Sequence, residues 1–160
     1  MLTRLNAALH RATCAAAIGL LAAIFVVMLL QIAFRYVLNA PLVWTEEAAR
    51  YLYIWACYLG AAVALRRGNH IVIALVLERL PPRVGGAVAL GTQVLGLLFF
   101  GALTVLGVEL MARTHTIEAI TLPIPWSAIY AAAPVGATIM FLQTVETMGG
   151  TLRALRGARP

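Results

Sequence analysis

The chain has 160 residues, of which 62% are hydrophobic and 11% are charged. With a mean hydropathy of +0.92 it lies far outside the range of soluble domains, so the composition indicates an integral membrane protein. The net charge of +6 does not indicate a nucleic-acid partner, because the basic residues, all arginines, fall between apolar stretches and form no basic domain.

Residues 12–34 form the first predicted transmembrane helix. There are no charges between Arg11 and Arg35, and at about 1.5 Å per residue this stretch is long enough to cross a hydrocarbon core of about 30 Å. A cleaved signal peptide is the alternative interpretation, but the apolar run is longer than the core of a typical signal sequence. We therefore expect a helix that stays in the membrane.

The second predicted span, residues 44–65, carries its charges at its beginning. Its uncharged part is too short to cross a membrane, so the helix has to include Glu46, Glu47 and Arg50. Arg50 lies four residues from the first glutamate and three from the second, so its guanidinium is predicted to pair with one of the carboxylates along the helix. One carboxylate is then left over.

Two interpretations of this charged helix start are open. The first is an interfacial ion pair within an aromatic belt, since aromatic residues gather where lipid meets water; the belt would consist of Trp44, Tyr51, Tyr53, Trp55 and Tyr58. The second is a polar contact with a partner, either a second membrane subunit or a soluble protein that docks from outside. An ion-translocating site is disfavoured, because such sites place acids near the membrane midplane and the acids here fall near predicted helix ends.

Residues 70–80 follow the second span and are too few to cross a bilayer. We predict a short helix that lies in the membrane interface, or a re-entrant piece that packs on protein. His70 and Glu78 would share its weak polar face, and Asn69 precedes it.

Two further spans are predicted, residues 84–108 and 126–145. The first of them is uncharged and rich in glycine, which favours close contact between helices in lipid. Pro125 and Trp126 mark the start of the fourth helix, because proline is tolerated where its missing N–H is not needed. Pro134 is predicted to bend this helix, and Ala132 and Gly136, or Ala133 and Ala137, offer small faces to a neighbouring helix.

The arginines predict the orientation, because basic residues in short connections resist translocation. Nine lie in the N-terminal segment, the second connection and the tail, and three lie on the other side; the nine are Arg4, Arg11, Arg66, Arg67, Arg79, Arg83, Arg153, Arg156 and Arg159, and the three are Arg35, Arg50 and Arg113. Both termini are therefore predicted to be cytoplasmic, with Glu46, Glu47 and Arg50 on the periplasmic side.

No enzymatic chemistry is indicated by the sequence. The histidines, His10, His70 and His115, lie outside the predicted spans, so they are not placed to hold a membrane haem, and none has another histidine at helical spacing for a metal. Cys14 and Cys57 lie in apolar stretches without the spacing of a redox pair. We therefore expect neither a cofactor nor catalysis, and the profile suits an accessory subunit.

Four segments in order resemble the small membrane subunit of the tripartite ATP-independent periplasmic (TRAP) transporters, over nearly the whole chain. They are Arg35-Tyr36, WTEEAARYLYIWACYLGAAVAL, RRGNHIVIALVLERLP and LPIPWSAIYAAAPVG. The chain departs from the family after His70, where many members carry an acidic residue and this sequence reads Ile73-Ala74-Leu75.

The resemblance implies one membrane domain of four helices in the bacterial inner membrane, acting as a scaffold beside a large membrane subunit. A periplasmic binding protein would deliver an organic acid, and this chain would bind neither the substrate nor the coupling ion. The resemblance places the predicted partner contact, Arg35, Trp44, Glu46, Glu47 and Arg50, near the docked binding protein or against the large subunit. The alternative is a self-contained four-helix exporter working as a homo-oligomer, which would need an acid near the middle of a helix.

Overall fold

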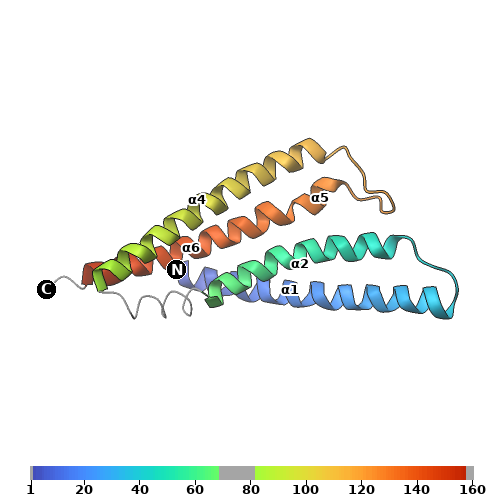
Figure 1. Cartoon of the computed structure of the whole chain (residues 1–160), viewed down its shortest axis with the longest axis horizontal. Coiled ribbons are helices and arrows are strands. Elements are labelled where there is room, and N and C mark those ends of the chain that lie inside the picture. The colour runs from blue at the N-terminus through green and yellow to red at the C-terminus, as the bar shows by residue number, and fades with distance from the viewer. Residues whose placement is uncertain (1, 69–81, 158–160) are drawn as a thin grey trace.

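The computed structural model describes residues 2–68 and 82–157, which fold into long helices lying side by side (Figure 1). The elements in chain order are α1 (Leu2–Ile32), the π-helix η1 (Ala33–Val37), α2 (Trp44–Gly68), α4 (Pro82–Thr114), α5 (Trp126–Tyr130) and α6 (Ala132–Gly157). Four helices of the described chain are long and apolar enough to cross a membrane. Both termini lie at the same end of the molecule, as an even number of spans requires (Figure 1).

The first three predicted spans each match a helix and the fourth covers α5 and most of α6, which confirms the all-α membrane fold. The helices run beyond the predicted limits: α1 begins at Leu2 and α4 continues to Thr114. The reason is that hydropathy predicts the part of a helix that lipid covers, whereas backbone hydrogen bonds continue into the polar interface. The predicted interfacial helix at residues 70–80, with Asn69, His70 and Glu78, lies outside the described residues.

α1 and α2 form one antiparallel hairpin, and α4 and α6 form another; α2 and α6 join the two (Figure 1). The first hairpin turns after η1, where the N–H of Leu38 donates to the carbonyl of Ala33 at 3.2 Å. Asn39 follows with a φ of 50°, a left-handed conformation that asparagine tolerates better than most residues. The turn brings the end of α1 alongside the start of α2.

Glycines on α4 and α6 allow close helix contact. A Cβ added at Gly107 would lie 2.8 Å from Cδ of Pro134, and one added at Gly136 would lie 2.8 Å from Cβ of Tyr58. Gly91, by contrast, has nothing within 4 Å. Of the predicted small residues of the fourth helix, Gly136 meets Tyr58 of α2, and Ala132 and Ala137 are both fully buried, so each predicted face contributes a buried residue.

The fourth span is interrupted at Ala131, between α5 and α6. Pro134 has no N–H to offer the carbonyl of Tyr130, one turn earlier, so the helix ladder loses a bond at this point. The indole N–H of Trp55 on α2 donates to the carbonyl of Ala128 at 3.2 Å. This bond ties α2 to the short helix α5.

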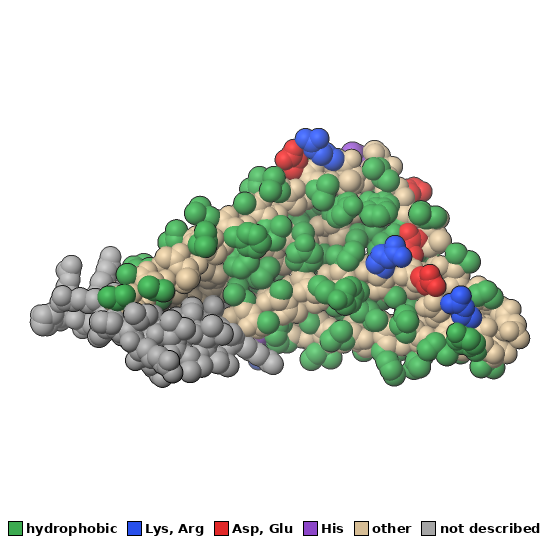
Figure 2. Space-filling view, viewed as in Figure 1, with side chains coloured by type: hydrophobic (Ala, Val, Ile, Leu, Met, Phe, Trp, Pro, Cys, Tyr) green, Lys and Arg blue, Asp and Glu red, His purple; other side chains and the backbone are tan. Residues whose placement is uncertain are grey.

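The described interior is built mainly from small residues, and the large apolar side chains of α1 and α4 face outward. The buried hydrophobic residues are Tyr51, Ala56, Leu59, Ala62, Ala89, Ile129, Ala132, Ala137 and Met140. Figure 2 shows hydrophobic side chains spread over most of the described part of the visible face. This distribution is the one expected of helices that lipid surrounds.

Candidate functional site

One end of the molecule, here named the loop end, lies opposite the termini and contains the predicted contact residues. It consists of η1, residues 38–43, the start of α2 and residues 115–125 (Figure 1). On the visible face, the arginine and glutamate side chains of the described residues gather toward this end (Figure 2). On this face, the loop end is therefore a charged region beside a largely apolar surface.

Glu47 lies at the centre of the loop end and is buried, with 9% of its surface exposed. Its carboxylate accepts hydrogen bonds from the hydroxyls of Tyr51 and Thr121. It also accepts from two backbone N–H groups, that of Ile120 at 3.2 Å and that of Thr121 at 2.7 Å. Four donors therefore satisfy this buried charge, and the three from Ile120 and Thr121 tie α2 to a loop more than 70 residues away.

The loop of residues 115–125 is a narrow hairpin. Glu118 and Pro125 form an antiparallel bridge, the N–H of Ala119 donates to the carbonyl of Ile124 at 3.0 Å, and that of Trp126 donates to the carbonyl of Ile117 at 2.9 Å. Near the tip, the N–H of Ile120 binds Glu47 while its side chain is 90% exposed. A fixed backbone thus presents an apolar side chain at the surface.

Pro125 and Trp126 begin the fourth span as predicted, with Pro125 in the extended conformation at the cap of α5. The ring of Trp126 meets the ring of Tyr51 edge-on, with the centroids 6.3 Å apart. It also packs against the ring of Tyr130 at 5.7 Å. These contacts fix the hairpin at its helix end, as the carboxylate of Glu47 fixes it near the tip.

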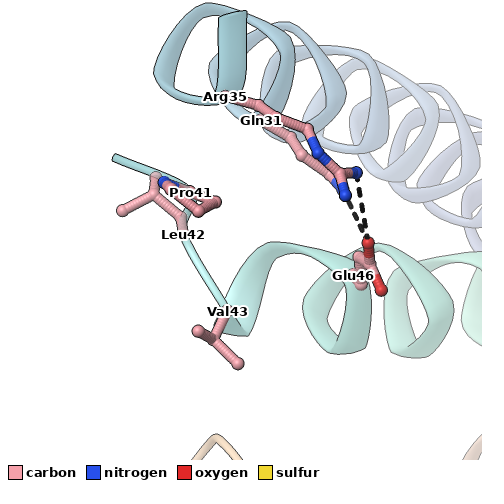
Figure 3. A pocket seen from close by; sticks show the side chains of 6 residues that line it. All are labelled: Gln31, Arg35, Pro41, Leu42, Val43 and Glu46. Atoms are coloured by element: carbon pink, nitrogen blue, oxygen red, sulfur yellow. Dashed lines mark hydrogen bonds and ion pairs between the residues drawn. The ribbon is translucent and has the colours of Figure 1, made fainter. Parts of the chain in front are cut away.

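Glu46 faces α1 instead of the hairpin. Its Oε1 accepts a hydrogen bond from Nε2 of Gln31 at 3.1 Å and lies 3.9 Å from Nη1 of Arg35 (Figure 3). The predicted pairing of Arg50 with a glutamate is wrong: within residues 2–68 and 82–157, Arg50 forms no ion pair with either one. The pairing rule considers neighbours on one helix only, whereas the turn after η1 brings Arg35 back beside α2.

The structure thus brings the predicted contact residues to the loop end but gives them different environments. Arg35, Glu46 and Arg50 are exposed, Trp44 is partly exposed and Glu47 points inward. A second ion pair, Arg113 with Glu109 at 2.7 Å, stands on the last turns of α4. In the part of the chain that the structure describes, no group of three or more potential ligands could hold a metal ion.

Three residues of this site were not singled out from the sequence: Gln31, Ile120 and Thr121. Gln31 could have been predicted from the sequence, because a polar amide near the end of an apolar helix usually meets a polar neighbour. Thr121 and Ile120 have none, since a contact across 74 residues depends on how the two hairpins pack.

Comparison with known proteins identifies the family that this chain resembles in sequence. A sequence model described as "Tripartite ATP-independent periplasmic transporters, DctQ component" matches residues 24–154. The sialic acid TRAP transporter small permease protein SiaQ of Vibrio cholerae is 33% identical over 140 residues, which cover 88% of this chain and 81% of that protein. The C4-dicarboxylate TRAP transporter small permease protein DctQ of Rhodobacter capsulatus is 29% identical over 115 residues, covering 70% of this chain and 50% of the relative.

A longer relative shows the same segment inside a larger chain. The isethionate TRAP transporter permease protein DctMQ of Oleidesulfovibrio alaskensis is 31% identical over 145 residues, which are 84% of this chain and 22% of that protein. The family model matches more than half of the chain, and the four apolar helices fit a permease subunit. The chain therefore belongs to the DctQ component family of the TRAP transporters, as a small permease subunit that crosses the inner membrane several times.

Proposed function

We propose that this small permease subunit is the scaffold of a hetero-complex and supports a large membrane subunit. The longer relatives favour this arrangement. The matching segment is 22% of the isethionate permease protein and 10% of the sialic acid TRAP transporter permease protein SiaT of Haemophilus influenzae. A segment that is joined to a larger permease in some relatives suits a separate subunit that binds a large one here.

The transported substrate is proposed to be an organic acid, bound by other subunits. The names of the relatives refer to sialic acid, C4-dicarboxylates and isethionate. This chain itself is proposed to bind no substrate, coupling ion or cofactor and to catalyse no reaction. The self-contained exporter, the alternative interpretation, finds no support in these relatives, which are permease subunits of TRAP systems.

The loop end is proposed to face the periplasm, with both termini in the cytoplasm. Two observations support this orientation. Both termini lie at one end of the molecule (Figure 1), and the sequence has more arginines in the segments predicted on that side than in those of the loop end.

The loop end is also proposed to form the contact with a partner, either the periplasmic binding protein or the large subunit. The observation that carries this proposal is the carboxylate of Glu47, which holds the hairpin so that the side chain of Ile120 stays 90% exposed. Arg35, Trp44, Glu46 and Arg50 add exposed charge and an aromatic ring to the same end of the molecule. Glu47 is buried, so it supports the surface through the hairpin instead of touching the partner.

The test compares substitutions at the two ends of the molecule. I120D and R50E change exposed side chains of the loop end, and R153E reverses an exposed arginine near the C terminus as the matched control. Central interface residues cost about 2 kcal/mol or more when altered, so uptake by the complete three-part system should fall by about tenfold or more in the first two variants.

Two further measurements identify the partner. Loss of the large subunit during purification of the tagged chain would place that subunit on the loop end. Intact co-purification with weaker affinity for the binding protein would assign the contact to the binding protein. If I120D and R50E keep wild-type uptake, or R153E lowers uptake equally, the loop end is not the contact surface.

A further inference from the structure

A pocket of about 150 Å³ opens at the loop end between the end of α1 and the start of α2 (Figure 3). One wall is polar and the other is apolar. The polar wall consists of Gln31, Arg35 and Glu46, and the apolar wall consists of Pro41, Leu42 and Val43. In Figure 3 the Gln31 and Arg35 side chains reach from the first hairpin arm toward Glu46 on the second.

The two charges of this wall are only loosely paired. Nη1 of Arg35 lies 3.9 Å from Oε1 of Glu46, and the two side chains are 57% and 65% exposed. A second ion pair, Arg113 with Glu109 on α4, closes to 2.7 Å. Within the described chain, Oε2 of Glu46 accepts no hydrogen bond. A cation and an anion can therefore each find an opposite charge in this pocket.

The position of the pocket limits what can enter it. Arg35 lies at the end of the span Ala7–Val37, and Glu46 lies at the start of the span Trp44–Arg66. Residues at the ends of transmembrane helices lie at the depth of the lipid head groups. Val43, which is 75% exposed, extends the apolar wall at the same depth. A ligand of this site thus combines two opposite charges with an apolar body.

We propose that this pocket binds the head group of a zwitterionic phospholipid with a primary ammonium, of the phosphatidylethanolamine class. The ammonium donates hydrogen bonds to the carboxylate of Glu46, the guanidinium of Arg35 donates to the phosphate, and the apolar wall contacts the glycerol and the first part of an acyl chain. A trimethylated ammonium has no N–H to donate. A purely anionic head group meets Glu46 without a compensating positive charge of its own.

This selectivity can be measured on the full chain, and it does not depend on the proposed partner contact. The protein is purified in micelles doped with equal amounts of dioleoyl phosphatidylethanolamine, phosphatidylcholine and phosphatidylglycerol, and retained lipids are counted by native mass spectrometry. Each hydrogen bond to a charged group contributes enough to separate related ligands by about tenfold. We therefore expect phosphatidylethanolamine to be retained about tenfold more than either competitor. Equal retention of the three lipids would overturn the proposal.

Three variants locate the lipid in the pocket. E46Q and R35Q each remove one charge of the loosely paired wall and should abolish the preference. E109Q removes a glutamate from the ion pair with Arg113 on α4 and should keep the preference. Both pocket side chains are more than half exposed, so folding is expected to persist, and unchanged thermal midpoints would verify this. A preference that survives in E46Q and R35Q would show that the lipid binds elsewhere and would overturn the site.

Discussion

Two adjacent glutamates at the start of α2 have opposite environments. Successive residues of a helix point about 100° apart, so Glu46 faces α1 while Glu47 faces the hairpin of residues 115–125. The first is largely exposed and loosely paired with Arg35. The second is buried and accepts four hydrogen bonds from within the chain. The same side chain therefore serves a surface role at one position and an internal role at the next.

The exchange of Glu47 for glutamine should destabilise the protein more than the same exchange at Glu46. An amide keeps one carbonyl acceptor but turns an NH₂ group toward donors that the carboxylate now satisfies. We expect E47Q to lower the thermal midpoint of the detergent-purified protein by several degrees and E46Q to change it little. Circular dichroism measures both midpoints; a larger shift in E46Q than in E47Q would contradict the internal role of Glu47.

Sequence alone could predict which residues of this site are polar but not which of them meet. The sequence predicts that α2 begins with its charged residues, because the uncharged part alone is too short to cross the membrane. The partner of Glu46 is Arg35, because a left-handed Asn39 helps the chain turn back after η1. Apart from Tyr51 on the same helix, the donors to Glu47 come from a loop 73 and 74 residues away, and their position depends on how α4 and α6 pack beside α2.

The sequence predicts the presence of the helices better than it predicts the residues at which they begin and end. Long uncharged runs have to cross the lipid as helices, because no other open structure satisfies its backbone there. The break at Ala131 was predicted only in part: Pro134 indicated a disturbed helix, but the interruption lies one turn before it. Pro134 has no N–H for the carbonyl of Tyr130, so the helix is interrupted there, whereas Pro134 itself lies within α6.

The contact between α4 and α6 depends on the absence of a side chain at Gly107. G107A places a Cβ 2.8 Å from Cδ of Pro134 and 3.2 Å from its backbone nitrogen, so the helices have to move apart. Overpacking of this kind costs about 1–3 kcal/mol. Unfolding in mixed micelles with increasing sodium dodecyl sulfate measures the loss.

The matched control for this contact is G91A on the same helix. Nothing lies within 4 Å of a Cβ at Gly91, and alanine favours a helix over glycine by about 1 kcal/mol. The control should therefore unfold at the same or a higher detergent fraction than the wild type. Equal loss of stability in G107A and G91A would mean that close approach of α4 and α6 does not contribute.

In the whole molecule, the loop end and the terminal end are expected to lie on opposite sides of the membrane. In a background where Cys14 and Cys57 are replaced by alanine, I120C should react with a membrane-impermeant maleimide added outside intact cells from which the outer barrier has been removed. L152C, a partly exposed position near the C terminus, should react only after the cells are opened. The reverse pattern would invert the proposed orientation.

The return of the chain to its starting side also bears on how such subunits can be joined to others. Because both termini lie at the same end, a polypeptide attached at the C terminus begins on the side where this chain begins (Figure 1). Attachment therefore leaves the insertion direction of either unit unchanged. A membrane unit whose own first helix starts from that side can be fused to this one, or separated from it, without rebuilding the topology of either.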